Sequence, residues 1–418
     1  MRKYRNTSVF YSDKQKTMLG RIFKFYRKQK GITPWEYIRF NNVCSDKTYA
    51  DIENGYPKQS YECYDALIEL YELKYIENKE LSMWLDHITI DLFNACMVMN
   101  QRVIKEISLE VENRLKAYNE YVIFSEYYQM FLLVFKYYAN ERYLTSKEVD
   151  FSLSLMEIFD DEIKIILLEV VAVSNSNYLL EYDTDERIYE LLKKYEENPV
   201  VNYYYAIYIT RRSETLIAIN IHGQLMYYWK TENNDYRFCK SLLGKFNAMW
   251  NMSIDYMLPI IEELDILMTK LQSQLFIDSI NYSVGAFYYT NGMFEKTIER
   301  FVLIDKIEKD HRVLLMICVC RTYMKTELPA ELNVMELDDS LIDKYLKYFK
   351  MKLSNAEPTK LERYIMTELI KCLKMERFEH PLWRLFEQEL LEFNTITKNY
   401  SIHRKYLAKM RKIKLSFD

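Results

Sequence analysis

Glycine and proline are scarce in this 418-residue chain, which contains only seven of each. No glycine lies between Gly55 and Gly223, and no proline lies between Pro57 and Pro199. Helical hairpins joined by polar turns can do without such breakers, whereas folds rich in strands and tight turns cannot. The chain is therefore expected to be all-α. Residues 200–229 are rich in Tyr, Ile and Thr, as strands are, but their neighbours favour helix.

Residue clusters typical of metal sites, disulfide frameworks and enzymes are also missing. The seven cysteines are scattered and odd in number, and none of the five histidines has a Cys or His at ligand spacing. We expect reduced thiols, no metal and no cofactor. No phosphate loop, zinc spacing or nucleophile elbow is present, and the acidic pairs Asp160-Asp161 and Asp338-Asp339 are typical of solvated turns. These absences favour a protein that is not an enzyme.

Long apolar runs are missing as well. The sequence has no stretch of eighteen apolar residues, and no apolar segment typical of a secretion signal follows its basic N-terminus. Hydrophobic residues make up 49% and charged residues 28%, which is ordinary for a globular protein. We expect a cytoplasmic protein with no membrane partner, long enough for two or three domains.

A short segment with strong helix boundaries, residues 45–55, stands out from this background. Ser45 is a favourable N-cap, because its hydroxyl can accept a hydrogen bond from an orphan backbone N–H, and Gly55 is a favourable stop. Tyr49 and Ile52 are three residues apart and share one side of the helix. The outward positions are then Asp46, Lys47 and Asp51. A helix that reads the major groove needs this layout, since only its outward side chains reach base edges.

The flanking segments predict further helices. Apolar residues at helical spacing precede this segment and end at Gly31, and a second such stripe follows it. The two stripes contain Leu19, Ile22, Phe23 and Tyr26, and Tyr64, Leu67, Ile68 and Tyr71. Between them, the run Thr33-Pro34-Trp35-Glu36 is typical of a helix start with a capping box. Residues 15–75 thus predict a helix, a helix–turn–helix and a closing helix.

These residues resemble the Cro/repressor-type (XRE) helix-turn-helix domain of bacterial and phage regulators. The resemblance rests on Arg27, Gly31, Thr33, Ser45, the run Ile52-Glu53-Asn54-Gly55, and Ser60. It implies an ion pair between Arg27 and Glu53 that ties the first helix to the third. It also implies base contacts by residues 46, 47 and 51. We predict in addition that Lys24 and Lys28 contact phosphates. The DNA-binding residues that we predict are Lys24, Lys28, Ser45, Asp46, Lys47, Thr48, Asp51 and Lys58.

Charge agrees with DNA binding, although the motif departs from its family. The turn before Ser45 is one residue longer than usual, Pro34 stands where a Gln is common, and acidic readers are uncommon. Residues 1–60 hold thirteen Lys and Arg against five acids, a net charge of +8, while the whole chain has −4. A basic module on an acidic body is typical of a nucleic-acid-binding head. The alternative is a helical-repeat scaffold or partner-binding protein whose head has lost DNA binding, which the acidic readers favour.

A second pattern lies at residues 283–301. Counted from Gly285, an aromatic residue stands at +3, Gly at +7, an aromatic at +9, a small residue at +12 and an aromatic at +16. This spacing resembles a tetratricopeptide (TPR) repeat at about 278–311. Gly285 and Thr297 would be small where the paired helices touch, and Gly292 would close the first helix. A helix-only chain of this length is expected to stack such hairpins into an α-solenoid.

A repressor-type domain at residues 1–75, followed by a TPR-like solenoid at 76–418, resembles the peptide-pheromone-responsive regulators of Gram-positive bacteria, the Rgg/PlcR/PrgX-like group. This implies a homodimeric transcription factor that binds double-stranded DNA and a short signalling peptide. Dimer contacts are expected from a C-terminal helix with Leu382, Leu385, Phe386, Leu390 and Leu391. The predicted peptide-binding residues are Asn202, Ser279, Asn281, Tyr282 and Tyr289. The alternative for these tyrosines is plain packing against the next hairpin.

Overall fold

The computed structural model describes residues 11–33, 43–58, 60–177, 182–305, 311–337, 340–370, 380–397 and 400–414. These segments contain helices and no strand, apart from an isolated bridge between Lys74 and Tyr121. The all-α prediction is confirmed, and the strand-like stretch at residues 200–229 forms helices too. Within the same segments, no helix has the length and apolar character that a bilayer crossing requires.

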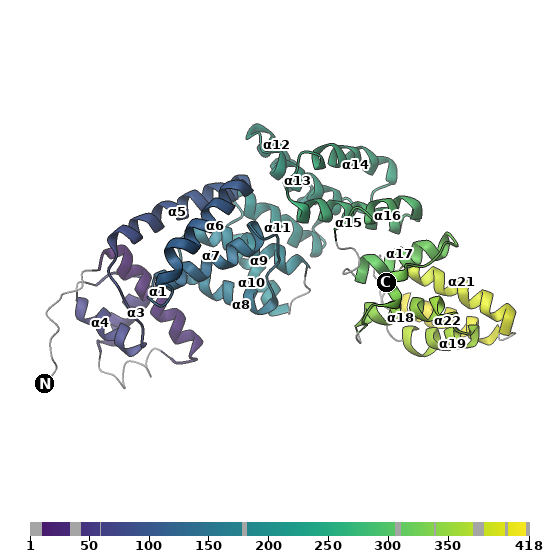
Figure 1. The fold of residues 1–418 in the computed structure, drawn as a ribbon, viewed down its shortest axis with the longest axis horizontal. Coiled ribbons are helices and arrows are strands. Elements are labelled where there is room, and N and C mark those ends of the chain that lie inside the picture. The colour runs from purple at the N-terminus through teal and green to yellow at the C-terminus, as the bar shows by residue number, and fades with distance from the viewer. Residues whose placement is uncertain are drawn as a thin grey trace. The chain divides into compact units, whose positions relative to one another are not determined.

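The chain forms two compact units, Met1–Asn251 and Met252–Asp418 (Figure 1). The described helices of the first unit are α1 (Asp13–Gln29), α3 (Asp46–Glu53), α4 (Tyr61–Leu70), α5 (Lys79–Val98), α6 (Gln101–Leu115), η1 (Lys116–Tyr118), α7 (Phe124–Tyr138), α8 (Ser146–Leu155), η2 (Met156–Ile158), α9 (Asp161–Asn177), α10 (Tyr182–Lys194), α11 (Pro199–Arg211), α12 (Thr215–Thr231) and α13 (Asp235–Ala248). The boundary predicted after residue 75 falls between α4 and α5, inside this unit.

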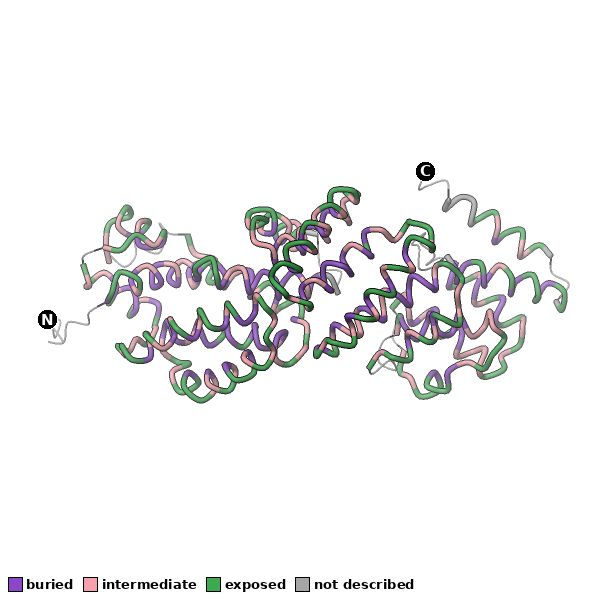
Figure 2. Tube along the Cα trace, turned by 90° about the horizontal axis from the view of Figure 1, so that it is seen from above, coloured by how far each residue is buried: buried purple, intermediate pink, exposed green. Residues whose placement is uncertain are grey.

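The second unit is helical as well. Its described helices are α14 (Ile254–Met268), α15 (Gln274–Thr290), α16 (Phe294–Phe301), α17 (His311–Tyr323), η4 (Ala330–Asn333), α18 (Leu341–Leu353), α19 (Pro358–Tyr364), the π-helical η5 (Ile365–Leu369), α21 (His380–Thr397) and α22 (Tyr400–Lys414). Within each unit, helices that follow one another in the sequence pack together, as in helical-repeat proteins. Buried residues recur along the helices at intervals, with exposed residues between them (Figure 2).

Polar caps and left-handed turns take the place of the scarce glycines. Several helices begin at a side chain that accepts a hydrogen bond from a backbone N–H of the first turn. These caps are Asn78, Asn100, Thr145, Asn198, Ser273 and Ser340. Eight described non-glycine residues adopt positive φ, among them Met99 at the end of α5 and Asn233 at the end of α12. Each such residue raises the free energy of the folded chain by roughly 1–2 kcal/mol, and the packing of the helices must offset this.

The repeat predicted at about 278–311 corresponds to the hairpin of α15 and α16. A Cβ built on Gly285 would stand 2.5 Å from a ring carbon of Phe301, so the two helices meet at this glycine. Thr297 is fully buried on α16, and Gly292 adopts φ +74° just after α15 ends. Gly285 therefore stands at the close contact between the helices, as the spacing predicted.

The apolar residues assigned to dimer contacts lie on α21, but most of them are enclosed. Phe386 packs against the rings of Tyr345 and Tyr348 from α18, at centroid distances of 6.3 and 5.1 Å. Leu382, Leu385 and Leu390 are also buried, and only Leu391 is exposed, at 45%. An apolar stripe predicts burial but not the partner, and here the partner is the second unit's own core. The four buried residues are therefore not available for contact with a second copy, whereas Leu391 is.

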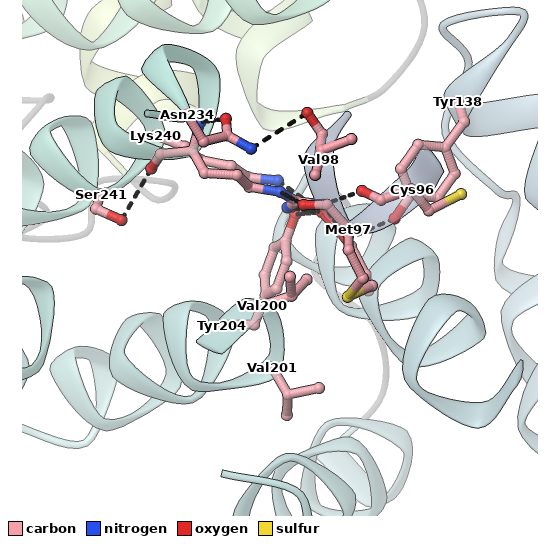
Figure 3. Close-up of polar contacts among 12 residues, drawn as sticks. Cys96, Met97, Val98, Tyr138, Val200, Val201, Tyr204, Asn234, Lys240 and Ser241 are labelled. Carbon is pink, nitrogen blue, oxygen red and sulfur yellow. Dashed lines mark hydrogen bonds and ion pairs between the residues drawn. The ribbon is translucent and has the colours of Figure 1, made fainter. Parts of the chain in front are cut away.

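A buried cluster of charged residues joins α9 to α13 in the first unit (Figure 3). The carboxylate of Glu169 accepts two hydrogen bonds from Arg237, at 2.7 and 3.0 Å, and one from Lys240 at 2.9 Å. Burial alone would raise the pKa of Glu169, but the two cations lower it to about 2. Burial also lowers the pKa of Lys240, to about 8.

Arg237 extends this cluster to the end of α5. Its Nε and Nη2 atoms donate to the backbone oxygens of Met97 and Cys96, at 3.1 and 2.6 Å. The side chain of Asn234 donates to the oxygen of Val98 at 3.3 Å. The last carbonyls of a helix have no partner within that helix, so these side chains cap α5 (Figure 3). We assign the cluster a structural role, because it fixes three helices and is enclosed by them.

Candidate nucleic-acid interface

The candidate reading helix, α3, meets α1 at one very close contact. A Cβ built on Gly20 of α1 would stand 1.8 Å from the carbonyl oxygen of Ile52, so only glycine fits there. Tyr49 and Ile52 are fully buried, as their spacing predicted, and the hydroxyls of Tyr49 and Tyr71 lie 2.7 Å apart. One side of α3 is thus held against both α1 and the end of α4.

The ion pair implied between Arg27 and Glu53 is present. Arg27 Nε lies 2.6 Å from Glu53 Oε1, and Nη2 lies 2.8 Å from Oε2, with both side chains at most 10% exposed. The hydrogen bond to Glu53 is the main cause that raises the pKa of Arg27. Nη1 also donates to the backbone oxygen of Ile32, at 2.8 Å. A bidentate pair has a fixed geometry, so it orients the C-terminal end of α3 on α1.

The N-terminal end of α3 is capped and exposed. Ser45 Oγ accepts a hydrogen bond from the backbone N–H of Thr48, at 3.2 Å, as predicted for an N-cap. Asp46 and Lys47 follow in the first turn; both are exposed, and neither forms an ion pair with a described residue. Beyond the helix, Gly55 adopts φ +80° and reverses the chain. α3 is therefore a short helix whose inner side is packed and whose N-terminal end is exposed.

Charge is balanced on the outward side of α3. Lys58, a predicted DNA contact, pairs with Asp51 at 2.5 Å, and both side chains are about one-third exposed. The other outward residues, Asp46 and Lys47, carry one charge of each sign. In the described residues, the net positive charge of the N-terminal region therefore does not lie on this side of α3.

The two predicted phosphate contacts on α1 lie where this helix joins the rest of the unit. Lys28 pairs with Glu157 of η2 at 2.6 Å, and nearby Arg21 pairs with Asp160 at 2.8 Å. Lys24 lines a cavity near the C-terminal end of α3, together with Asn54. Both lysines are thus placed away from the exposed N-terminal end of α3, and their contact with phosphates stays a prediction.

Part of the motif lies outside the described residues, and two other residues have roles that were not predicted. The helix start expected at Thr33-Pro34-Trp35-Glu36 continues into residues 34–42, which lie outside the described part of the chain. Gly20 and Tyr71 hold α3 in place, but sequence reasoning gave them no such role. An isolated glycine inside the apolar stripe of residues 19–26 was the available signal, because it indicates a close backbone approach.

The predicted peptide-binding residues do not form one site in a single unit. Asn202 belongs to the first unit, on α11, whereas the other four are on α15 of the second. Tyr289 is only 1% exposed, while Tyr282 is half-buried with its ring 6.3 Å from that of Phe301. The burial of Tyr289 favours the alternative that its ring packs inside the second unit. Ser279 is also half-buried, and its hydroxyl donates to the backbone of its own helix.

Asn281 differs from its neighbours on α15. It is 1% exposed, and neither its amide nitrogen nor its amide oxygen has a hydrogen-bond partner among the described residues. A buried polar group without a partner costs roughly 1–3 kcal/mol. No group of three or more His, Cys, Asp or Glu residues in the described chain is arranged to hold a metal ion.

Comparisons with protein-family models, curated proteins and solved structures gave no match to this chain.

Proposed function

We propose that this chain binds double-stranded DNA and that α3 enters the major groove. The observation that supports this most directly is the way α3 is held. Gly20 fixes the inner side of α3, and the Arg27–Glu53 pair fixes its C-terminal end. Its N-terminal end is left exposed, and the first side chains of a reading helix are those that reach base edges.

Each exposed side chain has a suitable partner on DNA. Lys47 would donate to guanine O6 or N7, and Asp46 would accept from cytosine N4. Ser45 already caps the helix, so its backbone is well placed to approach a phosphate. Lys58 would have to leave Asp51, or share it, in order to contact phosphate.

We also propose that the protein is a homodimer whose second unit responds to a short signalling peptide. A head that reads one half-site binds weakly, and two-fold dimers read paired half-sites. The unpartnered amide of Asn281 supports a polar ligand near α15, because an extended peptide offers backbone donors and acceptors for it. Light scattering at micromolar concentration tests the dimer, and a monomer would rule it out.

The DNA proposal is tested by selecting duplexes from a random-sequence library with the full-length protein. We expect one enriched motif, with an affinity that falls steeply as salt rises from 50 to 200 mM. The inverted repeat expected for a dimer would have half-sites about 34 Å apart. If no motif is enriched and no duplex binds at 50 mM salt, the proposal fails.

A second candidate function is a helical scaffold whose head contacts protein. The balanced charge on the outward side of α3 supports it, because phosphate contact needs an excess of cations. The same salt titration separates the two functions. A scaffold would leave labelled duplex free at 50 mM salt, whereas a DNA reader would bind it.

A further inference from the structure

We propose that the first unit contains a binding site for a small organic anion, between the helices that hold α3 and helices α8 to α10. The site is a cavity of about 830 Å³. One wall comes from α1 and from the C-terminal end of α3, where Glu53 and Asn54 lie. The opposite wall comes from α8, η2, α9 and α10. Ligand pockets in proteins typically have volumes of roughly 300–1,000 Å³.

The charged residues of this cavity have a positive excess. Its lining includes five cations, Arg21, Lys24, Lys164, Arg187 and Lys194, and three carboxylates, Glu53, Glu157 and Glu190. The ion-pair partners outside the lining are Arg27, Lys28, Asp160 and Asp161, which carry two charges of each sign. The excess of two positive charges is therefore not cancelled by the immediate surroundings.

Two of the five cations are free to meet a ligand. Arg21 pairs with Asp160 at 2.8 Å, and Lys164 pairs with Asp161 at 3.2 Å. Lys24 and Lys194, in contrast, form no ion pair with a described residue. Lys194 lies over the ring of Tyr195, 5.0 Å from its centroid, and its charge contributes to lowering the pKa of Asp161. A carboxylate or sulfonate between these two ammonium groups would offset one of the two excess charges, and a phosphate would offset about two.

The carboxylates of the lining do not compete equally for those cations. Glu53 is already engaged by Arg27, and Glu157 by Lys28. Arg187 approaches Glu157 at 3.7 Å and donates to the backbone oxygen of Leu153 at 2.9 Å. Glu190 alone among the three has no ion pair with a described residue, so one free carboxylate faces two free ammonium groups.

The remaining lining is apolar and selects a ligand with an apolar body. Leu153, Met156, Leu168 and Leu191 line the cavity, and Tyr195 adds an aromatic ring. The Tyr195 hydroxyl donates to Asp161 at 2.9 Å, which holds the ring in place. A lining that combines these apolar side chains with an excess of cations favours an amphipathic anion over a bare inorganic one.

The test measures fluorescence of the full-length protein with 8-anilinonaphthalene-1-sulfonate, an amphipathic anion. N-phenyl-1-naphthylamine, which has the same rings without the sulfonate, is the charge control. We expect saturable binding of the sulfonate at one site, and binding of the neutral compound at least tenfold weaker. Equal affinities would overturn the anion assignment.

Variants show whether the signal comes from this cavity. Lys194→Gln should weaken binding of the sulfonate roughly 1.5- to 5-fold, the effect of losing one exposed charge pair. The matched control is Lys193→Gln, since Lys193 is exposed on the same helix outside the lining, and it should change nothing. Leu191→Trp fills the cavity from α10 and should abolish binding while the helical circular dichroism stays intact. Unchanged binding by Leu191→Trp would overturn the site.

Displacement of the sulfonate identifies the anionic group. 1-Naphthoate and 1-naphthyl phosphate share their rings and differ in the anion, so the stronger competitor indicates a carboxylate or a phosphate ligand. Failure of both to compete would overturn the proposal. None of these measurements involves DNA, so their outcome is independent of whether α3 reads a duplex.

Discussion

Gly20 of α1 and Ile52 of α3 lie so close that a Cβ on Gly20 would stand 1.8 Å from the Ile52 carbonyl oxygen. That oxygen is backbone, so no side-chain rotation can relieve the clash. Gly20→Ala should therefore separate α1 from α3 and destabilise the first unit by about 3 kcal/mol or more, the upper end of overpacking effects. Hydrogen exchange of the α1 and α3 amides measures this loss.

The chain offers a matched glycine as the control. A Cβ on Gly223, in the middle of α12, would meet no atom within 4 Å. Gly223→Ala should stabilise the protein by about 0.5–1 kcal/mol, because alanine restricts the unfolded chain and favours helix. If hydrogen exchange showed the amides of α1 and α3 to be as well protected in Gly20→Ala as in Gly223→Ala, the close contact between Gly20 and Ile52 would be wrong.

The Arg27–Glu53 pair should behave as a buried charge pair. Glu53→Ala leaves the Arg27 guanidinium enclosed without its partner. We therefore expect the free energy of unfolding of the first unit to fall by about 3–5 kcal/mol. The double change Arg27→Met, Glu53→Leu should cost less than Glu53→Ala alone. The control is Lys14→Ala, which breaks an exposed pair with Asp86 and should cost about 1 kcal/mol or less. Denaturant unfolding distinguishes these outcomes, and equal losses for Glu53→Ala and Lys14→Ala would contradict the prediction.

Lys47 should contribute specificity if α3 reads DNA. Lys47→Ala should weaken binding to the selected duplex by roughly 1–3 kcal/mol and relax the preference at one base pair. Lys30→Ala is the control, since Lys30 is exposed after α1 and lies over the ring of Tyr71. Fluorescence anisotropy with the selected duplex and a scrambled duplex gives both affinities. A Lys47→Ala protein that binds and discriminates normally would remove this residue from the interface.

His222 should make the first unit sensitive to acid. Both ring nitrogens are buried without a hydrogen-bond partner, and burial lowers the pKa of this side chain to about 3. Because the unfolded chain binds the proton near pH 6.5, stability is complete above that pH and falls as pH drops towards 3. Between pH 6.5 and 5 the loss should approach about 2 kcal/mol.

Substitution of His222 isolates this effect from other titrating groups. His222→Leu keeps an apolar side chain of similar size and removes the proton. The variant should therefore gain stability relative to the original chain as pH falls from 6.5 to 5, by about 2 kcal/mol. A difference in stability that is constant over this range would show that His222 titrates alike in both states.

Asn281 allows the peptide proposal to be examined without knowing the peptide. If its amide is kept for a ligand, Asn281→Leu should stabilise the second unit by about 1–3 kcal/mol, because an unpaired buried amide is removed. Thermal unfolding measures this change. Destabilisation of similar size would show that the amide has a structural partner, and the support it gives to a ligand on α15 would be lost.

Local signals in the sequence predicted much of the fold. The cap at Ser45, the stop at Gly55 and the small residues of the α15–α16 hairpin are encoded within a few residues of where they act. Contacts across long separations were not predictable in this way. Arg237, for example, caps a helix that ends about 140 residues earlier, and no local pattern indicates that partner.

The candidate site likewise combines contacts that the sequence predicted with contacts that it did not. The Arg27–Glu53 pair followed from a family resemblance, whereas the ion pairs of Arg21 with Asp160 and of Lys28 with Glu157 did not. A count of charges in residues 1–60 could not show that several of these cations are used inside the unit. For α21, the apolar stripe predicted burial correctly but could not distinguish a partner copy from the second unit's own core.

The two-sided packing of α1 limits how far this protein can be treated as modular. On one side α1 holds α3 through Gly20, and on the other the Tyr26 hydroxyl donates to the buried carboxylate of Glu126 at 2.8 Å. A chimera that grafts residues 1–75 onto another body would leave that hydroxyl and the ring of Phe25 without their partners. The exchangeable piece in recombination or engineering therefore extends at least through Phe151 of α8, and residues 1–75 cannot be exchanged alone.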